Sequence, residues 1–402
     1  MLGALSVLAM IQLPHGLATG LKAMAADMLA NMDKPIGGRD VFDSSLTELC
    51  RFFSAASANR EPLVLATIVR TEGSTYRKAG ARILISTDGA TSGLISGGCL
   101  EADLCERAAR VLARGQPERA IFDSRVSNDP VWGIGLGCEG ANHIWLQAAT
   151  AENDYAPLRY LNRCLKEERT GTLATVIGGD ALTIELGRHS DDDPASRDAL
   201  SIKLSACSSP TAQIQTLRYL GRTLEVFVAP VVLPPSLLLC GAGPDAVPVA
   251  KFADLLGWRV TVVDHRPAFA TEANFPPAAR VLVARPSELI GRVDPSNFDA
   301  AVIMSHNLAH DIEYLRCFVA KTPDYIGLLG PPSRRERIFA EIGPDVRRIS
   351  DRVRGPVGLN IGANSPSGIA LSIVAQIHAV LCGKDDAVAD ALYDQQAQII
   401  MR

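Results

Sequence analysis

The sequence of 402 residues lacks a Cys-x-x-Cys pair, a strong excess of charge and a long hydrophobic run. Its nine cysteines are scattered and odd in number, which excludes a secreted disulfide framework or a zinc ribbon and favours reduced thiols in the cytoplasm. A net charge of -4 excludes a basic surface over the whole protein, so no nucleic acid partner is expected. No run reaches the roughly 18 apolar residues of a membrane span, so no membrane association is expected.

The first ten residues are apolar, but they lack the positively charged segment of a secretory signal peptide. We expect residues 1–40 to be a poorly ordered leader or the product of a start codon placed too early, with Met24 and Met32 as alternative starts. The composition of the whole sequence, 47% hydrophobic and 21% charged residues, is that of a globular protein. Its length predicts two or three domains at about 150 residues each.

Residues 41–233 are predicted to form a mixed α/β domain. The capping-box pattern Ser45-Leu-Thr-Glu48 begins a predicted helix that runs to about Ala58. Apolar runs rich in β-branched residues predict strands at residues 62–70 and 81–86. From about residue 155 to the end of this domain the periodicity is weaker.

The most informative segment is Ile95-Ser-Gly-Gly-Cys-Leu-Glu101, which places the thiol of Cys99 directly after Gly97 and Gly98. The residues that follow predict a helix, because apolar residues recur on one helical face. These residues are Leu100, Leu104, Ala108 and Val111. Cys99 would then lie near the helix N-terminus, where free N–H groups and the helix dipole favour a thiolate. Such a thiolate could be a nucleophile, a sulfur carrier or a soft metal ligand, whereas the alternative is a small buried side chain beside a turn.

A second thiol, Cys138, lies in another glycine-rich segment, Gly135-Leu-Gly-Cys-Glu-Gly140. Closely spaced glycines indicate positive φ angles or a close approach to the backbone. Two glycine-flanked thiols in one domain suit sulfur transfer or contact with a soft metal–sulfur centre. The alternative is that the two cysteines are unrelated and buried.

A doubly wound, Rossmann-like parallel sheet is predicted for residues 234–385. After Pro234-Pro235, short apolar strands alternate with helical segments, as this fold requires. Residues 386–402 are expected to be a C-terminal tail.

The first strand of this domain is followed by a dinucleotide-type glycine pattern formed by Gly241, Gly243 and Ala246. Gly241 would allow the tight turn and Gly243 the approach of a pyrophosphate, while Ala246 would let helix and strand pack closely. Asp264, at the end of the next strand, could bind a ribose hydroxyl group. Pro244 suits the first helical position. A Rossmann-like sheet that binds no nucleotide remains the alternative.

Two further groups of polar residues follow in the Rossmann-like part. His306 and His310, with Asp311, have a spacing that metal ligands can have. The favoured interpretation is that His306 ends a strand and that His310 and Asp311 begin the following helix. No metal site is therefore expected. Arg334 and Arg335, near a predicted helix start, could bind a phosphate or lie on a solvated face.

Taken together, these motifs resemble the XdhC/CoxI family, the accessory proteins of molybdenum hydroxylases such as xanthine dehydrogenase. The resemblance covers roughly residues 45–385. In the first half it rests on residues 73–81, 95–101 and 135–140, and in the second on residues 240–244, 262–267, 304–306, 326–330, 356–362 and 365–375.

The resemblance implies that the chain binds the molybdenum cofactor (molybdopterin), supports its sulfuration with a cysteine desulfurase and delivers it to a molybdenum hydroxylase apo-enzyme. A homodimer is also expected. Cys99 and Cys138 match the family's cysteine positions, so cofactor contact carries over to them. The other residues expected to contact the cofactor are Gly97, Gly98, Gly241, Gly243, Asp264, His306 and Arg334. Asn307, Asn360 and Gln376 stand where the family commonly has acids, so no acid–base role is expected there.

Two other functions fit the same residues, and the sequence leaves open whether the chain is an enzyme. The first is an NAD(P)-dependent oxidoreductase that binds its nucleotide at Gly241, Gly243 and Asp264 and uses His306 as acid or base. The second is a maturation scaffold that docks the desulfurase and the hydroxylase without holding the cofactor. Both keep the same predicted fold.

Overall fold

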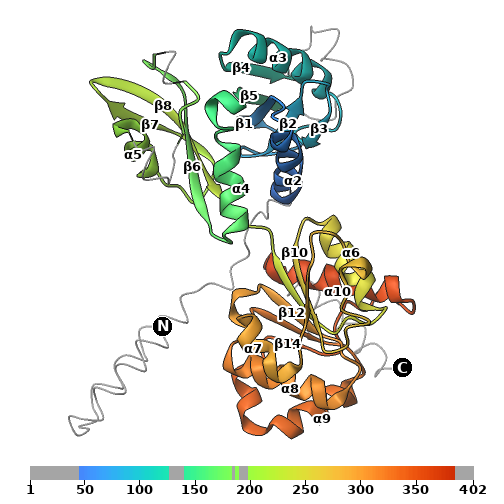
Figure 1. Cartoon of the computed structure of the whole chain (residues 1–402). Helices are drawn as coiled ribbons and strands as arrows, with labels where there is room; N and C mark the ends of the chain where they lie inside the picture. Colours follow the sequence, from blue (N-terminus) through green and yellow to red (C-terminus); the bar gives the residue numbers. More distant parts are fainter. Residues whose placement is uncertain (1–44, 126–139, 183–185, 190–197, 385–402) are drawn as a thin grey trace, which may run out of the picture. The chain divides into compact units, whose positions relative to one another are not determined.

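The computed structural model describes residues 45–125, 140–182, 186–189 and 198–384 (Figure 1). The expectations for the leader, for the C-terminal tail and for Cys138 therefore lie outside the described residues. By their internal contacts, Phe42–Glu288 form one compact unit and Leu289–Arg402 belong to a second. The domain limits drawn from the sequence stay predictions.

The first unit contains an antiparallel sheet of five strands in the order β3-β2-β1-β5-β4. Its strands are β1 (Leu63–Gly73), β2 (Arg82–Ser86), β3 (Thr91–Gly93), β4 (Glu118–Asp123) and β5 (Gly140–Ala149). The two strands predicted at residues 62–70 and 81–86 are confirmed as β1 and β2.

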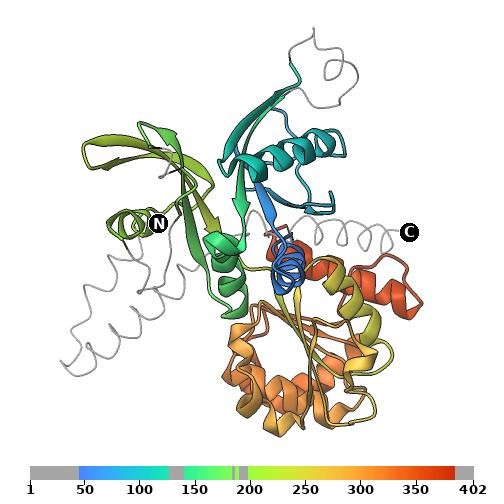
Figure 2. The same cartoon turned by 45° about the horizontal axis from the view of Figure 1, so that its top comes forward.

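Helices cover both faces of this sheet (Figures 1 and 2). On one face, helix α3 (Glu101–Arg114) buries the predicted stripe of leucines and valine against alternate residues of β1, among them Val64 and Ile68. On the other face, α2 (Ser45–Ala58) and α4 (Leu158–Lys166) pack against Leu63 and Leu65. Because successive side chains of a strand point to opposite faces, β1 contributes to both cores. The predicted helices at residues 45–58 and 100–112 are thus confirmed.

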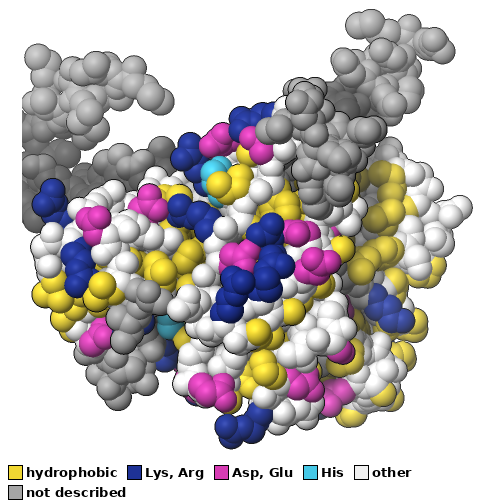
Figure 3. All heavy atoms as spheres, turned by 90° about the horizontal axis from the view of Figure 1, so that it is seen from above, with side chains coloured by type: hydrophobic (Ala, Val, Ile, Leu, Met, Phe, Trp, Pro, Cys, Tyr) yellow, Lys and Arg dark blue, Asp and Glu magenta, His cyan; other side chains and the backbone are white. Residues whose placement is uncertain are grey.

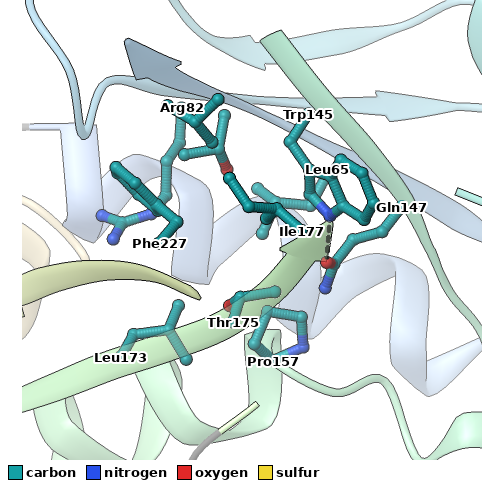
Figure 4. A pocket seen from close by; sticks show the side chains of 11 residues that line it. Leu65, Arg82, Trp145, Gln147, Pro157, Leu173, Thr175, Ile177 and Phe227 are labelled. Atoms are coloured by element: carbon teal, nitrogen blue, oxygen red, sulfur yellow. Dashed lines mark hydrogen bonds between the residues drawn. The ribbon is translucent and has the colours of Figure 1, made fainter. Parts of the chain in front are cut away.

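A separate antiparallel sheet of three strands, in the order β6-β8-β7, follows in the chain. It consists of β6 (Gly171–Gly179), β7 (Gln213–Tyr219) and β8 (Arg222–Val231), with helix α5 (Ala199–Ser205). The side chains of Ile177 and Phe227 pack against Val69 and Trp145 of the five-stranded sheet. Between the two sheets lies a small cavity, in which the centre of a water molecule could occupy a volume of about 10 Å³ (Figure 4). That volume suits roughly one buried water.

The remaining strands form a six-stranded sheet in the order β11-β10-β9-β12-β13-β14. Its strands are β9 (Ser236–Cys240), β10 (Arg259–Asp264), β11 (Arg280–Val283), β12 (Ala300–Ile303), β13 (Tyr325–Leu328) and β14 (Val353–Arg354). The main helices are α6 (Ala246–Leu255), α7 (Leu289–Arg292), α8 (Leu308–Ala320), α9 (Pro332–Ile342) and α10 (Pro366–Leu381). Because β9 lies next to both β10 and β12, the order runs outward in two directions, which confirms the predicted doubly wound fold.

Charges on the described surface are mixed. On the face seen from above, acidic and basic side chains are interspersed (Figure 3). Another mixed group joins α3 to β4, where Arg107 contacts Asp103 at 2.6 Å and Glu118 at 2.5 Å. Within the described ranges, no helix has the length and apolar character needed to cross a membrane.

Candidate functional site

The thiol of Cys99 is exposed, in the turn that precedes α3. The helix begins at Glu101 with Leu100 as its N-cap, so Cys99 lies just outside the helix. The N–H of Leu100 donates to the hydroxyl of Ser96 at 3.1 Å and to the carboxylate of Glu101 at 3.0 Å. The hydroxyl of Ser96 in turn donates to Glu101 at 2.6 Å. Ser96 and Glu101 therefore satisfy the backbone of the turn and leave the thiol directed outward rather than buried.

The two glycines before Cys99 differ in what the fold demands of them. Gly98 has a φ of +106°, a conformation that favours glycine. Gly97 has no positive φ, and a Cβ atom at either position would meet no atom of the described residues within 4 Å. Within the described residues, the backbone beside the thiol is thus open on the side where a side chain would stand. Packing inside the described chain gives no reason for glycine at position 97, whereas a ligand or partner that approaches the backbone closely would.

The strand directions place several loops at the same edge of the five-stranded sheet. β3 and β4 run in the same direction as β1, whereas β5 runs in the opposite direction. The carboxyl ends of β1 and β4 therefore lie where β5 begins, because Gly73 pairs with Gly140 and Asp123 with Ala141. β3 ends earlier, since Gly93 lies opposite Ile83, which pairs with Ala66 in the first half of β1. The Cys99 turn follows β3, whereas Cys138 lies outside the described residues, two positions before β5 in the sequence.

The stem of the segment before β5 is tightly fixed. The hydroxyl of Ser124 donates to the carbonyl of Gly140 at 2.7 Å, and the N–H of Gly140 approaches the same hydroxyl oxygen at 3.1 Å. A Cβ atom at Gly140 would lie 2.5 Å from the carbonyl oxygen of Ser74 and 2.6 Å from that of Glu72. Only glycine fits at this position, because two backbone segments meet there.

An ionic cluster lies beside this stem. Arg125 donates to Asp123 through two nitrogens, at 2.8 and 2.7 Å, and to Glu72 at 3.0 Å. These hydrogen bonds from Arg125 hold the pKa of Asp123 at about 2 and lower the pKa of Glu72 as well. His143 of β5 lies 3.4 Å from Glu72. Arg125, Asp123 and Glu72 therefore stay ionised at neutral pH and join the ends of β1 and β4.

The loop between β1 and β2, at the same edge, offers contacts that the sequence prediction did not include. Tyr76 is 59% exposed. Its neighbours Arg77 and Lys78 form no ion pair with any residue that the structure describes. An exposed aromatic ring next to two cations suits an anionic, planar ligand. The signal in the sequence is an aromatic residue followed by two basic ones between two glycines, at the end of a strand.

The glycine loop after β9 is held from within by Asp264. Its carboxylate accepts the N–H of Ala242 at 2.8 Å and two guanidinium nitrogens of Arg266 at 3.0 and 2.7 Å. The backbone N–H of Arg266 is a further donor, at 2.9 Å, and His265 lies 3.2 Å away. Burial alone would raise the pKa of Asp264, but these donors outweigh it and lower the pKa to about 2. With donors on both oxygens, the carboxylate has little capacity left for a ribose hydroxyl group.

The start of α6 follows the glycine loop and has few backbone donors to offer an anion. The helix begins at Ala246 and its N-cap is Asp245, whose side chain forms no capping hydrogen bond. The prediction that Pro244 occupies the first helical position is therefore wrong, because Gly243 and Pro244 extend the loop by one turn before the helix. Gly241 has a φ of +130°, as its predicted role in the tight turn requires. The N–H of Ala246 donates to the carbonyl of Gly243 at 2.9 Å and Pro248 has no N–H, so a phosphate at this helix start would depend mainly on the N–H of Val247.

His306 occupies an unusual backbone position after β12. Its φ is +59°, in the left-handed region, and its side chain is exposed. Ser305 bonds to the buried carboxylate of Asp311, and Asn307 caps α8 by accepting the N–H groups of Ala309 at 2.9 Å and His310 at 3.2 Å. A capping role explains why an amide can stand at position 307. In the described ranges, no three His, Cys, Asp or Glu side chains are placed to hold a metal ion.

Arg334 is directed at Asp311. Its Nε and Nη2 donate to one carboxylate oxygen at 2.9 and 2.6 Å. This pairing secures the turn that holds His306 and uses two of the five N–H groups of the guanidinium, which leaves two on Nη1 and one on Nη2. The neighbouring Arg335 lies over the ring of Phe339, 5.7 Å from its centre. Contact of Arg334 with a phosphate stays a prediction.

Gln376, on α10, ties three elements together. Its carbonyl oxygen accepts the hydroxyl of Tyr325 at 2.6 Å and the N–H of Gly358 at 2.9 Å, and its amide nitrogen donates to the carbonyl of Gly358 at 3.4 Å. Gly358 has a φ of +102° and packs against Ser372. The amide thus holds the loop after β14 against the sheet.

Two family models match the chain. The model described as the XdhC Rossmann domain matches residues 237–377, and the model described as the XdhC and CoxI family matches residues 56–123. The first range covers the glycine loop, His306 and Gln376, and the second covers the Tyr76 loop and the Cys99 turn.

Known proteins resemble the chain over most of its length. It is 33% identical over 323 residues to a protein of Bacillus subtilis described as a probable subunit of xanthine dehydrogenase, a match that covers 79% of this chain and 93% of the relative. It is 24% identical over 335 residues to the molybdenum cofactor insertion chaperone PaoD of Escherichia coli, covering 83% of this chain and 87% of that protein. The crystal structure of a xanthine dehydrogenase from Bacillus halodurans matches with a TM-score of 0.64 and 28% identity, covering 83% of this chain and 96% of that one. This chain therefore belongs to the XdhC and CoxI family.

Proposed function

We propose that this protein is an accessory chaperone that binds the molybdenum cofactor and inserts it into a xanthine dehydrogenase-type molybdenum hydroxylase. The observation that carries the proposal is the exposed thiol of Cys99 beside Gly97 and Gly98, where an added Cβ atom would meet no atom of the described residues within 4 Å. The insertion function of the Escherichia coli relative supports it.

The described residues suit the different chemical groups of molybdopterin. A thiol is a soft ligand, so Cys99 would contact the metal–sulfur end, with Gly97 and Gly98 allowing a close approach. Tyr76, Arg77 and Lys78 offer a ring and two cations to the planar, anionic part of the ligand. The N-terminus of α6 would contribute a donor to a phosphate. When bound, the cofactor would supply the molybdenum–sulfur centre, and the protein's own residues would bind it, orient it and exclude water.

The proposal includes further steps and partners. Cys138 would act with Cys99, and a cysteine desulfurase would sulfurate the cofactor before its transfer to the hydroxylase apo-enzyme. The protein would work in the cytoplasm as a homodimer. No disulfide joins any of the eight cysteines of the described ranges, which is the state that a reducing compartment would keep.

Transfer to a hydroxylase tests the proposal. Protein isolated without oxygen from cells that make the cofactor is mixed with cofactor-free xanthine dehydrogenase, and the gain of hydroxylase activity is measured. We expect activation by the wild type and by Cys207→Ser, a matched control whose half-exposed thiol donates to the backbone carbonyl of Lys203 and lies beside the core of the three-stranded sheet. Cys99→Ser and Cys138→Ser should activate poorly. Equal activation by all four proteins contradicts the assignment of the thiols.

The oxidoreductase alternative makes a different prediction. The donors around Asp264 disfavour ribose binding, because a ribose hydroxyl would have to displace Ala242 or Arg266. Titration with NADH should therefore show no tight binding and no turnover. Saturable NADH binding with turnover would favour the enzyme instead.

A further inference from the structure

The end of α10 brings together two side chains that the proposed function does not use. His378 lies in the last turn of the helix and Cys382 is its C-cap residue. The Nε2 atom of His378 lies 3.7 Å from the Sγ atom of Cys382. His378 is exposed and Cys382 is half-buried, so both atoms can be reached from solvent.

The separation of these two atoms matches a known coordination geometry. Zinc binds imidazole nitrogen at about 2.0–2.1 Å and thiolate sulfur at about 2.3 Å, and a tetrahedral angle between them gives an N···S distance of about 3.6 Å. The observed 3.7 Å therefore needs no rearrangement of the helix. A spacing of four residues keeps both side chains on one helical face.

The surroundings contain one favourable and one unfavourable charge. The end of α10, a helix of 16 residues, carries the negative end of the helix dipole, whereas the positive charge of Lys384 acts on Cys382. Imidazole and thiolate together suit a borderline or soft ion such as Zn²⁺, not the hard ions Mg²⁺ or Ca²⁺.

We propose that His378 and Cys382 form a chelating pair for Zn²⁺, with the remaining coordination positions open to solvent. Binding forms an N–Zn and an S–Zn bond, and the thiol proton leaves to water, with no change of oxidation state. This site is independent of the one proposed for the molybdenum cofactor.

Titration with Co²⁺ under reducing conditions tests the pair, because a cobalt–thiolate bond gives a charge-transfer absorption in the near ultraviolet. We expect one Co²⁺ per chain, displaced by Zn²⁺. His378→Ala and Cys382→Ala should each abolish the absorption, while thermal melting in the presence of a chelator checks that both variants remain folded.

Two control variants make the result specific. Cys207→Ser removes a half-exposed thiol that has no histidine partner in the described structure, and Cys99→Ser removes the thiol of the proposed cofactor site. Both should keep the cobalt absorption. The proposal is overturned if the wild type gives no absorption at excess metal, or if His378→Ala or Cys382→Ala binds Co²⁺ as the wild type does. Loss of cobalt binding in Cys99→Ser would place the ion at the other site and would likewise overturn it.

Discussion

The buried carboxylate of Asp264 accepts the N–H of Ala242 at 2.8 Å, so the acid at the end of β10 closes the glycine loop after β9. In nucleotide-binding Rossmann domains an acid at this position binds the ribose. In this protein the carboxylate instead accepts hydrogen bonds from the loop and from the guanidinium of Arg266. The same residue that makes the motif resemble a nucleotide site thus acts as a brace for the loop.

Asp264→Asn should destabilise the protein at neutral pH. The pKa of Asp264 is lowered from 3.8 to about 2, and a shift of that size corresponds to about 2 kcal/mol of folding free energy. Because the folded-state pKa is depressed, this stabilisation is present above the unfolded pKa and is lost as the pH falls toward 2. Urea unfolding should therefore show a difference between wild type and variant at pH 7 that shrinks steadily below about pH 4. A difference that does not change with pH would show that the charge of Asp264 is not the cause.

Substitutions of the two glycines before Cys99 should differ in their effect on folding stability but should both reduce cofactor binding. The added methyl group of Gly97→Ala meets no atom of the described residues within 4 Å and should leave the melting temperature unchanged. Gly98→Ala must adopt a φ of +106° and should cost about 1–3 kcal/mol. Molybdenum content should fall in both variants, because both add a side chain where the ligand approaches. Full molybdenum content in a stable Gly97→Ala protein would mean that nothing approaches this backbone.

Arg125→Ala should lower cofactor loading with little effect on stability. Arg125 is exposed, and exposed ion pairs contribute little to folding. Its hydrogen bonds to Asp123 and Glu72 fix the stem beside Gly140. We therefore expect the substitution to lower cofactor loading because this stem is no longer held in position. The matched control is Arg159→Ala, which removes another exposed ion pair, that with Asp154. Equal loading of the two variants would show that the cluster does not position the site.

Gln376→Ala should destabilise the Rossmann-like part. It removes the hydrogen bonds to Tyr325 and Gly358, and loss of buried hydrogen bonds costs about 1–3 kcal/mol. In a double-mutant cycle, Tyr325→Phe should cost less in the Gln376→Ala background than in the wild type. Strictly additive free energies of unfolding would show that the two side chains do not act together.

The sequence predicted the elements whose side chains repeat with a clear period. The stripe of Leu104 and Val111 located α3 and its buried face, and the apolar run before Gly241 located β9. Helix boundaries were less certain, as at Pro244, because an N-cap is decided by local backbone angles that residue types do not determine. The three-stranded sheet was not predicted as a separate layer, since its strands alternate weakly between buried and exposed positions.

The candidate site could be predicted only in part. The glycine-flanked Cys99 was visible as a motif, but its exposure depends on the hydrogen bonds of Ser96 and Glu101 to the turn. The ion pairs of Arg334 with Asp311 and of Arg266 with Asp264 were not predicted. Side chains that only folding brings together have no regular spacing in the sequence by which they could be recognised. Tyr76 was visible in the sequence, yet its exposure follows from the edge of the sheet at which its loop lies.

The central claim is that this protein holds the molybdenum cofactor through the exposed thiol of Cys99. The most direct measurement is the molybdenum and pterin content per chain of wild type and Cys99→Ser, both isolated without oxygen from cells that make the cofactor. The proposal predicts that both contents are substantial in the wild type and fall together in the variant. Wild-type protein free of molybdenum and pterin, or a folded Cys99→Ser protein that carries as much of both, would contradict it.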